Sequence, residues 1–200
     1  MSATPAPDAL DLTAFGDESE SVRLKDPDTY ILVATLCSNL EHEDLRDTMR
    51  SLLPRGQRKV HWRETTNDRE RRRIIDAVAG AGVEHVVVVR DGSPGERPER
   101  RRRHCLERLC YELDQLGVSR LLLESRGPAD DKRDRNLLDT MLAKRTLPGG
   151  LRIGHATGPS EPLLWLPDVV CGAVTHSRLG DDSYLQALRS TVELVEIVAD

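Results

Sequence analysis

Three acidic residues that lie far apart in the sequence fall at positions where carboxylates can do chemistry. Asp17 follows a stretch that alternates like a β-strand, and Glu124 closes the apolar segment RLLLE. Asp168 is the only charged residue between Glu161 and His176. An ionised aspartate in so apolar a segment is costly to bury unless it is paired or binds a metal ion.

If these three acids meet in the fold, they require a cation, because neighbouring carboxylates repel one another and resist full ionisation. Mg²⁺ and Mn²⁺ prefer oxygen ligands and retain water molecules that can react. Such ions activate water and stabilise the leaving oxygen in phosphodiester hydrolysis. The three acids together therefore favour metal-dependent hydrolysis of a phosphodiester.

Each acid also has an ordinary structural interpretation. Asp17 and Glu18 could form a polar turn after a strand, and Glu124 could be a solvated strand end. Asp168 follows Pro167, a residue that favours helix starts, so it could serve as a helix N-cap. The convergence of all three, rather than any one of them, carries the prediction.

The chain has 200 residues, which suits one domain. We expect a flexible N-terminus over residues 1–11 and a single domain over residues 12–200. The formal net charge of -5 argues against a protein that coats nucleic acid by charge alone. Arginine far outnumbers lysine, which either favours bidentate phosphate contacts or reflects a GC-rich genome.

The cysteines and the apolar segments indicate a soluble cytoplasmic protein. No pair of cysteines has the spacing of a zinc site, and their apolar surroundings suit a reducing compartment. The N-terminal residues lack the pattern of a signal peptide, and no apolar run approaches the ~18 residues of a membrane span. No signature of a nucleotide cofactor, serine hydrolase or zinc protease occurs.

The order of apolar segments predicts an α/β domain with three layers, in which helices cover both faces of a central mixed sheet. The last amphipathic stretch is expected to be helical and to pack on its own domain rather than form a dimer face. We expect strands over 10–16, 30–37, 83–92, 119–125 and 151–156, and helices over 41–53, 66–80, 99–116, 130–145, 169–176 and 183–199.

Several segments carry a family resemblance: AFGDESES, YILVATLC, KVHWRE, RLLLES and LLWLPDVVCGAVTHSRLGDDSYLQAL. Together they resemble the domain of unknown function 3800 family over roughly residues 12–190. The two ends are the specific parts, whereas the middle matches in element order. The resemblance implies a ribonuclease H-like fold and a metal-dependent nuclease that cleaves DNA or RNA.

The resemblance also implies roles for particular residues. Asp17, Glu124 and Asp168 would bind Mg²⁺ or Mn²⁺, and Glu64 would complete the catalytic carboxylates. The expected substrate-binding residues are Lys59, His61, Arg63 and Arg126, with Lys59 and His61 also candidates for proton transfer. The sequence departs from the family pattern at Glu124, where aspartate is commoner, and at Trp165 and Pro167.

Two arginine-rich segments, 69–73 and 97–104, are candidates for phosphate contacts, although such runs on helices more often form a solvated face. Two other functions stay open. The fold could serve as a non-catalytic module that binds nucleic acid or protein. A carboxylate pair could instead hydrolyse a glycoside, in which case activity would not depend on metal.

Overall fold

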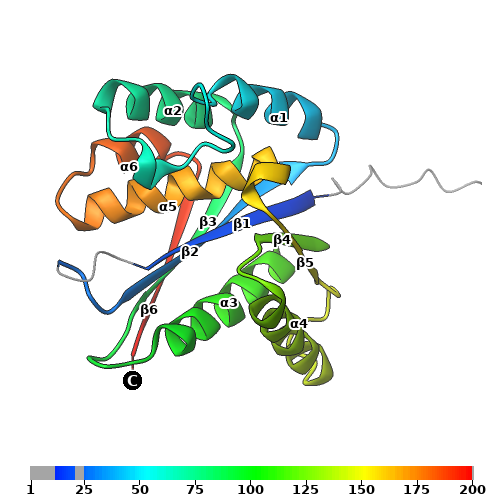
Figure 1. Cartoon of the computed structure of the whole chain (residues 1–200). Helices are drawn as coiled ribbons and strands as arrows, with labels where there is room; N and C mark the ends of the chain where they lie inside the picture. The colour runs from blue at the N-terminus through cyan, green and yellow to red at the C-terminus, as the bar shows by residue number, and fades with distance from the viewer. Residues whose placement is uncertain (1–11, 21–24, 200) are drawn as a thin grey trace, which may run out of the picture.

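The computed structural model describes residues 12–20 and 25–199, so the expected flexible segment 1–11 lies outside the described residues. A six-stranded sheet with the order β5-β4-β1-β2-β3-β6 runs through the molecule (Figure 1). Its strands are β1 Leu12–Glu20, β2 Thr29–Ser38, β3 Glu84–Asp91, β4 Arg120–Glu124, β5 Arg152–Ala156 and β6 Val192–Val198.

The sheet is mixed, as the sequence predicts. β2 pairs antiparallel with both β1 and β3, whereas β1–β4, β4–β5 and β3–β6 are parallel pairs. β2 is buried along nearly its whole length, which explains its continuous apolar sequence. The pairing places Asp17 opposite Val33 and Gly16 beside Leu123, so β1 passes directly alongside the end of β4.

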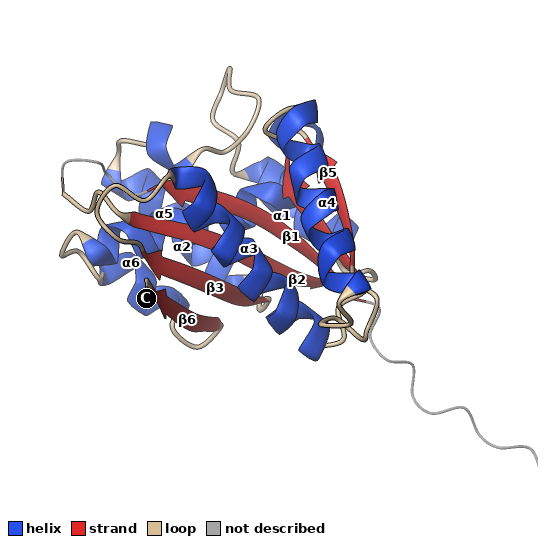
Figure 2. Cartoon of the chain, turned by 90° about the horizontal axis from the view of Figure 1, so that it is seen from below, coloured by secondary structure: helices blue, strands red, loops and turns tan. Residues whose placement is uncertain are grey.

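Helices cover both faces of the sheet and complete the three layers (Figures 1 and 2). The core on one face joins Ile31 and Val33 to α1, α2, α5 and α6, and the core on the other joins Leu32 and Ala34 to α3 and α4. The helices are α1 His42–Ser51, α2 Asp68–Gly80, α3 Pro98–Gln115, α4 Pro128–Ala143, α5 Trp165–Arg178 and α6 Ser183–Leu188. Among the described residues, no helix is both long and apolar enough to cross a membrane.

Two expected boundaries are wrong. β1 does not end at Gly16 but continues to Glu20, because β2 supplies antiparallel partners as far as Glu20 opposite Tyr30. The last amphipathic stretch is not one helix: it divides into α6 and the strand β6, whose β-branched residues suit the sheet. β6 pairs with β3, so this stretch does pack on its own domain.

Candidate functional site

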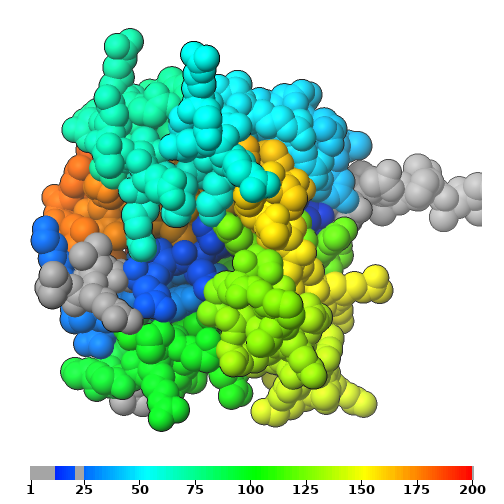
Figure 3. Space-filling model, in the orientation of Figure 1, coloured from blue at the N-terminus to red at the C-terminus, as the bar shows by residue number. Residues whose placement is uncertain are grey.

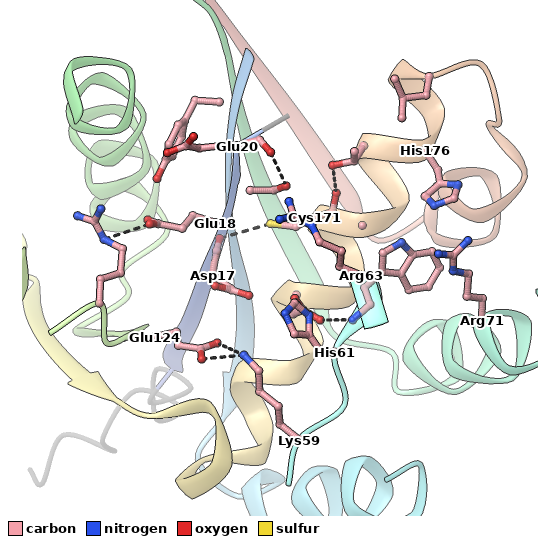
Figure 4. A pocket seen from close by; sticks show the side chains of 18 of the residues that line it. Asp17, Glu18, Glu20, Lys59, His61, Arg63, Arg71, Glu124, Cys171 and His176 are labelled. Carbon is pink, nitrogen blue, oxygen red and sulfur yellow. Dashed lines mark hydrogen bonds and ion pairs between the residues drawn. The ribbon is translucent and has the colours of Figure 1, made fainter. Parts of the chain in front are cut away.

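A pocket of about 880 Å³ opens beside β1 and brings together seven of the eight residues that the sequence singles out. Figure 3 shows this face as a hollow between segments far apart in the sequence, and Figure 4 shows the side chains that line it. The lining includes Asp17, Lys59, His61, Arg63, Glu124, Arg126 and Asp168. Three elements, β1, the end of β4 and the first turn of α5, therefore supply the carboxylates.

Asp17 lies inside β1 rather than after it, and points into the pocket (Figure 4). Burial raises the pKa of its carboxyl group well above the usual value, and the charges of Asp168 and Glu124 raise it further. The three carboxylates thus interact electrostatically across the pocket. Such mutual repulsion is the condition that a bound cation relieves.

Glu124 is already paired with a cation from the chain. The ammonium group of Lys59 donates to both carboxylate oxygens, with Nζ 2.8 Å from Oε1 and 3.1 Å from Oε2 (Figure 4). Burial is the largest single influence on the pKa of Lys59 and lowers it, but the hydrogen bond to Glu124 and the charges of Glu124, Asp168 and Asp17 together outweigh burial, so the pKa is raised. Gly158 permits this pair, because a Cβ there would lie 2.7 Å from Glu124 Oε1 and 2.8 Å from Lys59 Cδ.

Asp168 lies in the first turn of α5, where Pro167 is tolerated because that turn leaves backbone N–H groups unpaired anyway. It is not the N-cap, a position that Leu164 holds. Its Oδ2 accepts a hydrogen bond from the backbone N–H of Trp62 at 2.7 Å, and its Oδ1 lies 3.3 Å from His61 Nδ1. This contact with Asp168 raises the pKa of His61.

Glu64 is the expected site residue that the structure does not bring to the pocket. It ends the short 3₁₀ turn Trp62–Glu64, is exposed, and is absent from the pocket lining. The side chains of this turn point in different directions. His61 contacts Asp168, whereas the side chain of Glu64 is exposed to solvent. Proximity in sequence to two pocket residues was a poor guide to side-chain direction across a tight turn.

Glu18 follows Asp17 in β1 and enters a network of buried charges. Its Oε2 accepts from Arg102 Nε at 2.6 Å, and Arg102 also holds Asp134, with Nη2 2.9 Å from Oδ2. His155 Nε2 lies 2.9 Å from the same Oδ2. Arg126 adds a second contact to Glu18, with Nε 3.1 Å from Oε1. This network holds β1 in place next to Asp17. The sequence did not indicate these ion pairs, because their members lie far apart along the chain.

The donor types in the pocket fit a divalent cation. Asp17, Glu124 and Asp168 offer the oxygen ligands that Mg²⁺ and Mn²⁺ prefer, and their repulsion favours an added positive charge. Their present arrangement does not yet form a binding group: within residues 12–20 and 25–199, no three His, Cys, Asp or Glu side chains are placed to hold a metal ion. Lys59 holds Glu124 in this arrangement, so a cation bound by all three acids requires that ion pair to open.

Two solved structures are similar to this chain in overall fold. A PCNA:RNase HII complex from Archaeoglobus fulgidus matches with a TM-score of 0.56 and 12% identity, covering 90% of this chain and 87% of that chain. The chain has a ribonuclease H-like fold. Ribonuclease H2 from Pyrococcus horikoshii OT3 matches with a TM-score of 0.51 and 10% identity, covering 84% of this chain and 74% of that chain. No family model and no curated protein matches the sequence.

The pocket also includes residues that sequence reasoning did not assign to the site. These residues are Trp62, Arg71, Thr175, His176 and Leu179. Arg71 belongs to the arginine-rich segment 69–73, which the sequence indicates as a candidate for phosphate contacts. Which of its side chains faces the pocket depends on how α2 packs. His176 carried no signal beyond its position near the end of an apolar helix.

Proposed function

We propose that this protein is a divalent-metal-dependent nuclease that hydrolyses phosphodiester bonds in DNA or RNA. The observation that carries the proposal is the electrostatic coupling of Asp17 with Asp168 and Glu124 in one open pocket of a ribonuclease H-like fold. In ordinary structural roles these acids would be spread over the surface rather than line one pocket. Coupled and facing a pocket, they suit cation binding and phosphate chemistry.

In this proposal Asp17, Glu124 and Asp168 hold Mg²⁺ or Mn²⁺. Such an ion would supply an activated water and would stabilise the charge on the leaving oxygen. The backbone N–H of Trp62 keeps Asp168 oriented by its 2.7 Å hydrogen bond. In the same proposal His61, whose pKa is raised by its contact with Asp168, donates a proton or a hydrogen bond to a phosphate oxygen.

The basic residues of the pocket would bind the substrate. Arg63 is exposed and Arg126 lines the pocket while pairing with Glu18. Guanidinium groups match phosphate oxygens well because their N–H groups form a planar fork. Glu64 is left without a catalytic role, since it is exposed and outside the pocket lining.

The proposal includes three points about the chain as a whole. Residues 12–200 are taken as one domain, built on the single sheet that includes strands from Leu12 to Val198. The resemblance to the domain of unknown function 3800 family at both ends is taken as membership of that family. A cytoplasmic location agrees with four buried cysteines that form no disulfide.

The test is cleavage of labelled single-stranded, double-stranded and hybrid DNA and RNA in Mg²⁺, Mn²⁺ or EDTA. We expect cleavage that needs metal and is lost in Asp168→Asn, which keeps an oxygen acceptor for the N–H of Trp62. Asp139→Asn, an exposed change on α4, is the matched control. Metal-independent cleavage, or full activity in Asp168→Asn, would contradict the proposal.

Asp17→Asn gives a second readout. Burial and like charges raise the pKa of Asp17, so the fold is less stable with this carboxyl group charged than with it neutral. The neutral asparagine should therefore raise the melting temperature while abolishing cleavage. A destabilised Asp17→Asn would show that the carboxylate is there for structure.

One observation favours a second function. Because Lys59 already neutralises Glu124, the same pocket could belong to a non-catalytic module that binds nucleic acid or protein. Nucleic-acid binding without cleavage in either metal, unchanged in Asp168→Asn, would support that function.

A further inference from the structure

The pocket has a second end whose chemistry differs from that of the carboxylates. In Figure 4, Glu124 and Lys59 lie on one side of the pocket, whereas Arg71 and His176 lie on the other. Arg71 comes from α2 and His176 from α5. The Trp62 ring belongs to this end, because it contacts both Arg71 and His176.

Arg71 has a positive charge without a negative partner. Its guanidinium carbon lies 5.3 Å from the centroid of the Trp62 ring, and its Nε is buried without a hydrogen-bond partner. In the part of the chain that the structure describes, no acidic side chain forms an ion pair with it. Arg73, two residues further along α2, instead pairs with Glu70 at 2.7 Å. A partly buried guanidinium with unused donors favours an anion from outside the protein.

An aromatic cluster fixes the position of this guanidinium. The rings of His176 and Tyr184 meet Trp62 edge-on, with centroids 5.6 and 5.0 Å away. Gly172 leaves the space for the indole, since a Cβ there would lie 2.1 Å from Trp62 Cγ. Arg71 therefore lies over a rigid surface, which lowers the entropic cost of using its N–H groups in binding.

Trp62 connects the two ends of the pocket. Its backbone N–H binds Asp168 at the carboxylate end, while its ring packs beneath Arg71. Because Trp62 contacts both Asp168 and Arg71, it fixes the position of the guanidinium relative to the carboxylates. A ligand bound by Arg71 would therefore lie at a defined place relative to them. Arg63 follows Trp62 and is exposed beside the same pocket, so it adds a second guanidinium.

We propose that Arg71, assisted by Arg63 and His176, forms a phosphate-binding subsite for a nucleic-acid strand that extends from the carboxylates. The strand as occupant rests on the proposed function, whereas the anion site rests on Arg71 and its surroundings. The subsite holds a phosphate next to the one at the carboxylates, and reads charge rather than sequence.

The test is binding of a labelled single-stranded oligonucleotide, followed by fluorescence anisotropy in EDTA across a series of salt concentrations. Arg71→Met keeps the aliphatic stem over Trp62 and removes the charge. We expect binding to weaken about tenfold, because a charge-assisted hydrogen bond is lost. The slope of log affinity against log salt should fall by about 0.7, the contribution of one phosphate contact on a single strand.

Arg72→Met is the matched control. Arg72 is the next residue of α2, and its guanidinium carbon lies 5.9 Å from the centroid of the Tyr184 ring, but it does not line the pocket. We expect it to leave the salt slope unchanged. Equal effects of the two variants would overturn the subsite, because they would show that only general charge matters. Melting temperatures of both variants establish that each is folded.

A competition experiment separates a strand from a free phosphate. Inorganic phosphate that displaces the oligonucleotide from the wild type, but displaces it more weakly from Arg71→Met, supports a site for a single phosphate group. Equal displacement from both proteins would overturn the subsite. Because no step needs metal or cleavage, an Arg71-dependent slope in a protein that cuts nothing would refute the nuclease and retain the subsite.

Discussion

Asp134→Asn tests whether the buried charge network beside the pocket stabilises the fold. The side chains of Arg102 and Asp134 are each 3% exposed, and His155 also contacts Asp134. Removing one partner of a buried ion pair costs about 3–5 kcal/mol, since the other charge is left uncompensated. Arg102 still keeps Glu18 at 2.6 Å, so we expect the lower end of this range, about 3 kcal/mol.

Urea denaturation followed by circular dichroism measures this loss. With a slope of about 2 kcal/mol per molar urea for a protein of this size, the midpoint should fall by about 1.5 M. Asp139→Asn, exposed on the same helix, should change the free energy of unfolding by less than about 0.5 kcal/mol.

A double variant separates charge from packing. Arg102→Met with Asp134→Leu removes both charges and keeps most of the volume, so it should lose less stability than Asp134→Asn alone. Glu18 retains Arg126 in that background. A loss below about 1 kcal/mol in the single variant, or a larger loss in the double variant, would refute the reasoning.

Three further changes test the site and the core. Lys59→Met should tighten Mn²⁺ binding about tenfold by calorimetry, because it removes the ammonium hydrogen-bonded to the carboxylate at the end of β4. The exposed Lys132→Met should not alter it, and weaker binding in Lys59→Met would show that the lysine assists the metal. Gly172→Ala should cost about 1–3 kcal/mol through overpacking against the indole and change the near-ultraviolet circular dichroism. Gly80→Ala, where a Cβ meets nothing within 4 Å, should be close to neutral or stabilising, and an equally mild Gly172→Ala would contradict this account. Burial lowers the pKa of His85 to about 4, so the unfolded chain takes up its proton first as the pH falls. Stability should be complete above pH 6.5 and should fall by about 3 kcal/mol towards pH 4, and the profile of His85→Gln should lack this component in urea titrations.

The sequence predicts those parts of the fold in which the local pattern and the tertiary environment agree. The apolar run of β3 forms a buried strand, and α2 begins close to its expected start, where Asn67 accepts from the N–H groups of Arg69 and Glu70. Asp168 was identifiable because a lone charge in an apolar segment demands a partner. Its partners, Trp62 and His61, could not be read from the pattern because they depend on a tight turn more than 100 residues away.

The remaining features depend on long-range pairing. β1 extends beyond Gly16 only because β2 lies against it, and polar residues such as Asp17 and Glu18 carry no strand signal themselves. The sequence pattern of residues 192–198 is compatible with both an amphipathic helix and an edge strand. Hydrogen bonding to β3 selects the strand. The directions of the Glu64 and Arg71 side chains were likewise not predictable from the sequence. They follow from tertiary packing and not from the spacing of residues along the chain.

The pairing of β6 with β3 has a consequence for how the protein is made. Between these neighbouring strands the chain passes through α3, α4, α5, α6, β4 and β5. During synthesis on the ribosome, the edge of β3 that pairs with β6 therefore has no partner strand until all of those elements have emerged. Its four consecutive valines, Val86 to Val89, make that edge a template for pairing with other nascent chains. Pairing with β6 therefore closes an edge that could otherwise act as a template for aggregation, and chaperones would act in the interval before β6 docks.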